Sequence, residues 1–226
     1  MQVQGINDEI KGILFDLDGL LVNSEKLYWD SNIQAAKEAK LDIPEDSYLK
    51  LTGATVQEMQ DFYHKYFKTT AERDRFIKRT DELVWQWTDE GKLKLQPGVQ
   101  AALDRFQALG LKMAIASSNY EDVLEHALWA TGIRNYFDFH LSYLDVQKGN
   151  IKAKPAPDIY LAAAKRINLP KENLLVFEDS STGVQAAKNA DIKVVMIPDL
   201  KAPSAKDRAN ATMICKNFFE FLEKIR

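Results

Sequence analysis

Acidic residues stand in pairs at two places in the sequence, each directly after a short apolar run. The first pair is Asp16 and Asp18, and the second is Glu178 and Asp179. Residues two apart in an extended chain point to the same side, so Asp16 and Asp18 would place their carboxylates close together. Close carboxylates repel each other unless a cation lies between them. With no His or Cys nearby, these four acids are a hard-oxygen ligand set, which suits Mg²⁺ better than zinc.

A lysine precedes a proline-rich turn in the second half of the chain. Lys154 is followed by Pro155 and Pro157, which hold it off the helix that comes next. A lysine that faces a carboxylate cluster can balance the charge of a nucleophilic aspartate and of a bound phosphate. Lys148 and Lys152 lie close by in the sequence, so position alone does not single out Lys154 from solvent-exposed loop lysines.

The segment Ser117, Ser118 and Asn119 ends a predicted strand and begins a predicted helix. Hydroxyl groups and free backbone N–H groups at a helix N-terminus bind anions. Asn119 is also expected to be the N-cap of this helix, and the two roles are compatible. Each polar residue taken singly could be a solvated strand end or a helix cap, but all of these clusters fall where predicted strands end.

Strands and helices alternate over most of the chain. One predicted strand ends between Asp16 and Gly19, and the others cover residues 111–116, 137–141, 174–177 and 192–197. The intervening helices cover residues 99–109, 119–130, 157–167, 182–189 and 217–224. This alternation predicts a doubly wound parallel sheet, a Rossmann-like α/β core. Ligands bind outside the carboxyl ends of strands in such sheets, where the polar clusters would meet.

A helical block interrupts this core. Helices are predicted over residues 25–40, from a capping box at Thr55 to Glu58, and from a second capping box at Thr69 to about residue 89. No strand is predicted between residues 24 and 91. The chain therefore divides into a core of residues 1–22 and 92–226 and an inserted, small all-helical cap of residues 23–91. A cap that leaves from the end of the first strand would lie over the site as a lid.

Composition excludes several function classes. The 226 residues include 30 basic and 33 acidic side chains, which argues against phosphate-neutralising nucleic-acid binding. No apolar run is long enough to cross a membrane, and the first ten residues have neither a basic cluster nor an apolar run. The single Cys215 fits a reducing compartment. We expect a cytoplasmic protein and, because no apolar stripe is left over, a monomer.

Four segments resemble, in order, the four motifs of the haloacid dehalogenase superfamily of phosphotransferases. They are DLDGLLVNSE at residues 16–25, SSN at 117–119, KPAPD at 154–158 and FEDSSTG at 177–183. The insertion after the first motif matches the core-and-cap layout of that superfamily, so the resemblance covers essentially the whole chain. It is similar to the branch of β-phosphoglucomutase and sugar-phosphate phosphatases, which carry a small helical cap.

The resemblance implies a role for each catalytic residue. Asp16 would be the nucleophile that forms an aspartyl-phosphate, and Asp18 the general acid and then the general base. Ser117 would hydrogen-bond the phosphoryl oxygens, and Lys154 would balance charge. True dehalogenases of the superfamily lack the second aspartate, so Asp18 favours phosphoryl transfer.

The resemblance also implies a metal site and a substrate site. Mg²⁺ would be held by Asp16, the backbone carbonyl of Asp18, Glu178 and Asp179. The residues expected to contact phosphate or substrate are Gly19, Glu25, Ser118 and Asn119.

Two positions separate a phosphatase from a mutase. The mutase branch has a cap histidine where this sequence has Tyr28, and an arginine that grips the second phosphate where it has Val56. Both differences favour a Mg²⁺-dependent phosphatase that acts on a small phosphorylated metabolite such as a sugar or polyol phosphate. A β-phosphoglucomutase-type mutase is the alternative, and a non-catalytic module that binds phosphometabolites is a third possibility.

Overall fold

A six-stranded parallel sheet forms the centre of the molecule. In the computed structural model, which describes residues 1–52, 54, 56–149 and 151–226, the strands lie in the order β3-β2-β1-β4-β5-β6. They are β1 (Gly12–Phe15), β2 (Lys112–Ala116), β3 (Phe139–Leu141), β4 (Leu174–Glu178), β5 (Lys193–Met196) and β6 (Met213–Ile214). Neighbouring strands run parallel. The predicted doubly wound α/β fold is confirmed, and the short edge strand β6 lies outside the predicted strands.

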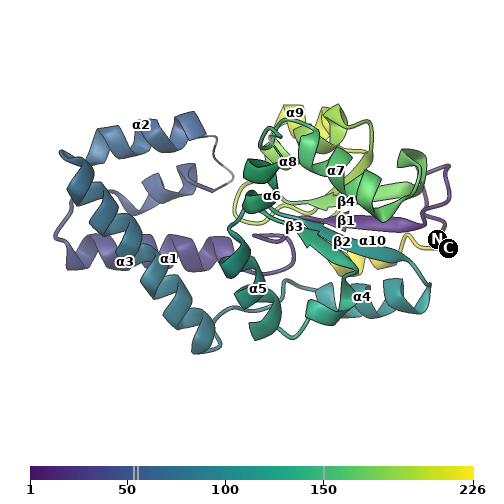
Figure 1. The fold of residues 1–226 in the computed structure, drawn as a ribbon, viewed down its shortest axis with the longest axis horizontal. Coiled ribbons are helices and arrows are strands. Elements are labelled where there is room, and N and C mark those ends of the chain that lie inside the picture. Colours follow the sequence, from purple (N-terminus) through teal and green to yellow (C-terminus); the bar gives the residue numbers. More distant parts are fainter. Residues whose placement is uncertain (53, 55, 150) are drawn as a thin grey trace.

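Helices cover both faces of this sheet (Figure 1). One face carries α4 (Val99–Ala108), α5 (Glu121–Ala130) and α10 (Phe218–Leu222). The other carries α6 (Tyr143–Lys148), α7 (Asp158–Ile167), α8 (Ser181–Asn189) and α9 (Ala205–Asn210). Short 3₁₀ helices are η2 (Arg134–Tyr136) and η3 (Lys171–Asn173). Alternate residues of β1 enter the two apolar layers, as expected for a strand buried on both faces.

Phenylalanines fix the two strands that carry the acidic pairs. Phe15 on β1 is paired in register with Phe177 on β4, and their rings stack with centroids 5.5 Å apart. Both side chains are fully buried, and burying each stabilises the fold by about 1.5–3 kcal/mol. The residue after each phenylalanine is an acid, so this register places Asp16 beside Glu178 at the carboxyl edge of the sheet.

A separate group of helices lies at one end of the molecule, on the left of Figure 1. It contains α1 (Ser24–Glu38), η1 (Glu45–Lys50), α2 (Val56–Tyr66) and α3 (Thr70–Asp89). Residues 24–52, 54 and 56–91 contain no strand, as predicted. These helices enclose their own apolar cluster, in which Tyr48 and Phe76 are buried. None of the helices in the described ranges combines the length and apolar character needed to cross a bilayer.

The N-cap predicted at Thr69 forms, but the Glu72 side chain of the predicted capping box reaches back to Lys68 instead of Thr69. The Thr69 hydroxyl accepts a hydrogen bond from the backbone N–H of Glu72, whose carboxylate accepts one from the backbone N–H of Lys68. The box predicted at Thr55 lies outside the described residues, as does the side chain of Val56.

The two chain segments that join the helical group to the sheet lie side by side. The backbone N–H of Asn23 donates to the carbonyl of Lys94 at 3.0 Å, and the N–H of Lys94 donates to Oδ1 of Asn23 at 2.7 Å. Val22 and Leu95 form an antiparallel bridge. The helical group therefore leaves the core and returns to it at one point.

Candidate active site

A buried lysine links the two acidic pairs. Nζ of Lys154 lies 2.5 Å from Oδ1 of Asp16 and 2.6 Å from Oε1 of Glu178, and the lysine side chain is only 5% exposed. Burial opposes its charge, but the carboxylates of Asp16 and Glu178 raise the pKa of the Lys154 ammonium well above its ordinary value. The structure thus identifies Lys154 as the lysine of the site, whereas its neighbour Lys152 is exposed.

Glu178 is the most enclosed carboxylate of the site. It accepts hydrogen bonds from Lys154, from the Tyr160 hydroxyl at 2.6 Å and from Oγ of Ser180 at 3.0 Å. A Cβ at Gly183 would lie 1.8 Å from Oε1 of Glu178, so only glycine fits against this carboxylate. Tyr160 is absent from the predicted site residues, because its place in α7 suggests only a core aromatic.

Asp18 is held by three side chains, one at the start of α1 and two from the segment that follows β2. Its carboxylate accepts hydrogen bonds from Oγ of Ser24 at 2.7 Å, Nδ2 of Asn119 at 3.1 Å and Oγ of Ser117 at 3.4 Å. Burial raises the pKa of Asp18, and these hydrogen bonds act in the opposite direction. Two predicted residues, Ser117 and Asn119, therefore meet the Asp18 carboxylate, and Ser24, which was not among the predicted site residues, joins them.

The predicted N-cap role of Asn119 is wrong. Helix α5 begins at Glu121 after Tyr120, and no side chain caps it. The amide of Asn119 instead donates to Asp18, while its backbone N–H donates to Oγ of Ser117 at 3.0 Å. The Asn119 side chain is held by its hydrogen bond to Asp18 and therefore does not cap α5.

Three of the four predicted metal-binding residues form one cluster. Asp16, Glu178 and Asp179 each offer a carboxylate oxygen, and these oxygens lie within 4.8 Å of one another. Burial and the charge of Glu178 raise the pKa of Asp16 to about 8 against the opposing charge of Lys154, and the same two causes raise the pKa of Asp179 well above its ordinary value. A divalent cation would offset this repulsion, and a set of oxygen ligands is the one that Mg²⁺ prefers. The residues therefore fit Mg²⁺.

Gly19 gives this cluster room. Its backbone has a φ of +76°, and a Cβ there would lie 2.4 Å from Oδ2 of Asp179. Its carbonyl accepts a hydrogen bond from the amide of Gln96 at 2.9 Å. Gly19 therefore permits the close approach of the β1 loop to the second acidic pair.

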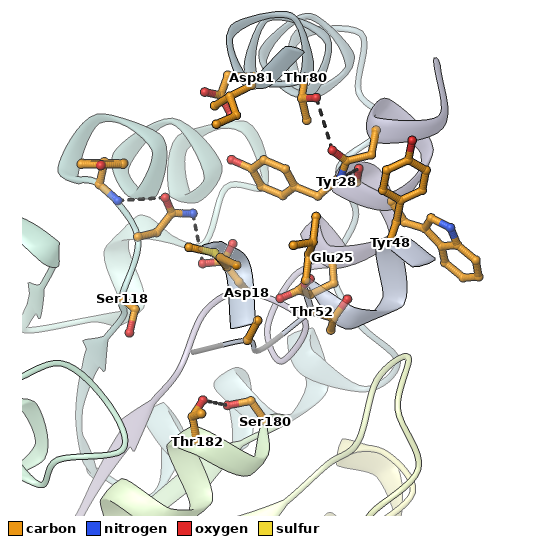
Figure 2. Close-up of a pocket in the computed structure, with 18 of the residues that line it drawn as sticks. Asp18, Glu25, Tyr28, Tyr48, Thr52, Thr80, Asp81, Ser118, Ser180 and Thr182 are labelled. Atoms are coloured by element: carbon orange, nitrogen blue, oxygen red, sulfur yellow. Dashed lines mark hydrogen bonds between the residues drawn. The ribbon is translucent and has the colours of Figure 1, made fainter. Parts of the chain in front are cut away.

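Glu25, in the first turn of α1, lies on the side of the helical group that faces Asp18 (Figure 2). Burial and the charge of Asp18 raise the pKa of Glu25 to about 7, and a hydrogen bond with the Thr52 side chain lowers it. The carbonyl of Thr52 accepts a hydrogen bond from Nζ of Lys201 at 2.5 Å, so a core loop contacts the helical group here. Ser118 lines the same cavity from the core side.

A cavity of about 490 Å³ connects these residues with the helical group. Figure 2 shows Asp18 and Ser118 on the core side, with Thr80 and Asp81 on the opposite side and Tyr28 between them. The volume is within the roughly 300–1,000 Å³ range of pockets that hold drug-sized ligands. The acids, the lysine and the cavity thus form one site at the carboxyl ends of the strands.

The fold and this arrangement of acids define a family of enzymes. Residues 13–197 match the model of the haloacid dehalogenase-like hydrolases. The chain belongs to this family, and the predicted class of enzyme, a phosphoric monoester hydrolase, is confirmed.

Individual relatives agree with that class. The phosphorylated carbohydrates phosphatase of Thermotoga maritima is 30% identical over 184 residues, which is 81% of this chain and 83% of the relative. The mitochondrial (DL)-glycerol-3-phosphatase 1 of Arabidopsis thaliana is 28% identical and aligns with 84% of this chain and 64% of its own length.

Solved structures show the same fold. CbbY from Rhodobacter sphaeroides in complex with phosphate has a TM-score of 0.74 at 24% identity, covering 93% of this chain and 96% of its own. β-Phosphoglucomutase from Clostridium difficile has a TM-score of 0.69 at 22% identity, covering 95% and 96%. These two likenesses concern the fold alone.

Proposed function

We propose that this chain is a Mg²⁺-dependent phosphatase that hydrolyses a small sugar or polyol phosphate through an aspartyl-phosphate on Asp16. The observation that carries the proposal is the buried bridge from Lys154 to both Asp16 and Glu178, with Asp18 held two residues further along. A carboxylate nucleophile needs a cation beside it to offset the charge of the incoming phosphate, and Lys154 lies against Asp16. Asp8, by contrast, forms its ion pair with Lys193 at the surface, where its side chain is 43% exposed.

In the first step, a carboxylate oxygen of Asp16 attacks the phosphorus. The bond between phosphorus and the alcohol oxygen breaks as the new bond to Asp16 forms. Asp18 gives its carboxyl proton to the departing oxygen, so that a neutral alcohol leaves. Such proton transfer contributes about 10²–10⁴-fold in rate. Ser24 and Asn119 orient Asp18 for this transfer.

In the second step, water attacks the phosphorus of the aspartyl-phosphate. Asp18, now a carboxylate, takes a proton from that water while the bond between phosphorus and Asp16 breaks. The products are orthophosphate and the original Asp16 carboxylate. Splitting one difficult substitution into two is the advantage of a covalent intermediate.

Charge balance comes from Lys154 and from the metal. Lys154 lies against Asp16, where it offsets the negative charge of the incoming phosphate. Mg²⁺ held by Asp16, Glu178, Asp179 and the carbonyl of Asp18 would neutralise phosphoryl oxygens and help align the reacting groups. Ser117, whose hydroxyl lies 3.4 Å from Asp18, and Ser118 follow β2 and would hydrogen-bond those oxygens.

The same proposal divides the chain into a core of residues 1–22 and 92–226 and a cap of residues 23–91. The paired connections at Asn23 and Lys94 support one hinge between them. A cap that closes on the substrate excludes bulk water during the first step and reopens for release.

The charge of the cavity favours a phosphatase over a phosphosugar mutase. Among the described residues that line it, Lys154 is the one cation, and two carboxylates already engage it. A mutase must hold a second, non-reacting phosphate. Tyr28 stands where the mutase branch has a histidine, and it lines this cavity.

The test is phosphate release from a panel of sugar, polyol and glycolate phosphates. We expect release that stops with a chelator, returns with Mg²⁺, and falls by at least about 10⁴-fold in Asp16→Asn. Asp8→Asn, a surface acid paired with Lys193, is the matched control and should keep full activity.

Two results would contradict the proposal. Conversion of β-glucose 1-phosphate to glucose 6-phosphate without release indicates the mutase. Binding of phosphometabolites without turnover of any compound indicates a non-catalytic module.

A further inference from the structure

Two kinds of polar side chain line the part of the cavity farthest from Asp16. Asn32 and Thr80 are engaged within the protein: the Asn32 amide donates to the carbonyl of Tyr28 at 2.8 Å, and the Thr80 hydroxyl donates to the carbonyl of Phe76 at 3.0 Å. They also contact each other, with 3.4 Å between Oγ1 of Thr80 and Oδ1 of Asn32. Both side chains therefore already have partners within the protein.

Asp81, Tyr28 and Tyr63 are different. Within the described part of the chain, their carboxylate and hydroxyl groups have no hydrogen bond or ion pair, although all three residues line the cavity. Burial raises the pKa of both phenols, and the nearby carboxylate of Asp81 adds to the rise, so both remain donors. Two O–H donors and a carboxylate acceptor thus lie together without partners.

The charge of Asp81 limits what can bind there. The described lining contains five carboxylates, and its single lysine lies at the opposite end. A second phosphate or a carboxylate on the substrate would be repelled. A neutral or cationic group with N–H or O–H donors would instead give Asp81 the partner it lacks.

The walls around these groups are aromatic and apolar. Met59 and Ile77 line the cavity from the helical group, and Tyr120 and Tyr143 line it from the core. The rings of Tyr120 and Tyr143 meet edge to face, 5.2 Å apart, and Tyr120 is 63% exposed. Exposed aromatic rings of this kind are stacking surfaces for planar ligands such as nucleobases.

We propose that Asp81, with the hydroxyls of Tyr28 and Tyr63, is the specificity site for a planar, donor-bearing ring at the far end of the substrate. Given the proposed phosphatase activity, the substrate is a sugar phosphate whose sugar carries such a ring, which is the chemistry of a nucleoside monophosphate. The sugar hydroxyls would lie near Glu25, between the phosphate and the ring.

The experiment compares phosphates of ribose, with and without the ring, and a bisphosphate of another sugar. The four common ribonucleoside 5′-monophosphates are assayed beside ribose 5-phosphate, which lacks the ring, and fructose 1,6-bisphosphate, which adds a second phosphate. We expect at least one nucleotide to exceed ribose 5-phosphate by about 10-fold or more in kcat/KM, and the bisphosphate to be the poorest substrate.

Variants then assign the preference to Asp81. Asp81→Ala should lower kcat/KM for the preferred nucleotide by about 10- to 100-fold, the range of a hydrogen bond to a charged group. Ribose 5-phosphate should change less than about twofold, because it does not reach the ring site. Glu82→Gln is the matched control: this neighbour on α3 pairs with Arg79 and does not line the cavity. It should leave both substrates unchanged.

The outcomes separate this inference from the proposed function. Turnover of ribose 5-phosphate equal to that of every nucleotide, or an equal loss on both substrates in Asp81→Ala, would overturn the ring site and leave the phosphatase standing. Absence of Mg²⁺-dependent release from every compound would overturn both.

Discussion

The two ends of the cavity differ in how their polar groups are satisfied. At the phosphate end, Glu178 is fixed by Lys154 and Tyr160, and Asp18 by Ser24 and Asn119. At the far end, the Asp81 carboxylate has no partner in the described chain. The groups that every substrate needs are thus held before binding, whereas a group that selects among substrates is left for the ligand to complete.

Removing the lysine should damage the phosphate end most. Lys154→Met leaves Asp16 and Glu178 buried without a cation, so we expect a loss of about 3–5 kcal/mol in unfolding free energy together with loss of phosphate release. Urea unfolding and a release assay measure both. The exposed neighbour variant Lys152→Met should change neither, and equal behaviour of the two variants would contradict the prediction.

A methyl group beside Glu178 tests how tightly that end is packed. Gly183→Ala places a carbon 1.8 Å from the Glu178 carboxylate, which must shift away from Lys154 and Tyr160. Overpacking of this kind costs about 1–3 kcal/mol, more than the roughly 1 kcal/mol that alanine gains in a helix. We expect lower stability and at least about tenfold weaker release. Lys188→Ala, on the exposed side of α8, is the control for urea unfolding.

A smaller change isolates one hydrogen bond. Tyr160→Phe removes the buried hydroxyl that donates to Glu178, with an expected loss of about 1–2 kcal/mol in unfolding free energy. Tyr136→Phe is the control: this hydroxyl donates to Asp104 and accepts from Gln100 at the surface, where water replaces both partners, so the variant should stay within about 0.5 kcal/mol of the wild type. An unfolding free energy equal to that of the wild type would show that Lys154 and Ser180 hold Glu178 without this hydroxyl.

The smallest effect is expected in the helical group and has the opposite sign. The Tyr48 side chain is 2% exposed, and its hydroxyl has no hydrogen-bond partner among the residues that the structure describes. Because an unsatisfied buried hydroxyl is costly, Tyr48→Phe should be neutral or stabilise the fold by up to about 1 kcal/mol. A destabilised variant in urea unfolding would mean that the hydroxyl finds a partner in solution.

The ends of β1 and β4 were predictable from sequence because an apolar run marks the strand and the acids after it mark the site. An apolar run followed by acids identifies the end of β1 and of β4, and parallel pairing then brings Asp16 and Glu178 together without further information. The same argument could not choose among Lys148, Lys152 and Lys154, since nothing local marks which lysine turns inward.

Residues with two roles were the ones that sequence reasoning misjudged. Asn119 is a residue type that often caps helices, but its amide donates to Asp18 instead. Tyr160 fits the apolar pattern of its helix, and its hydroxyl donates to Glu178. The short helices α6 and α9 were also missed. Each begins with a capping box made by a serine and an aspartate three residues later, Ser142 with Asp145 and Ser204 with Asp207. Such a box does not predict a helix by itself when no apolar periodicity follows it.

The paired segments at Asn23 and Lys94 have a consequence for how such a molecule can change over time. The inserted helices begin and end at the same place. The bridge between Val22 and Leu95 therefore joins the two parts of the sheet domain, whatever is inserted between them. Loop closure depends only weakly on the length of the intervening chain. The residues that choose the substrate can therefore be lengthened, shortened or exchanged as a unit, while the strands that carry Asp16 and Glu178 keep their register.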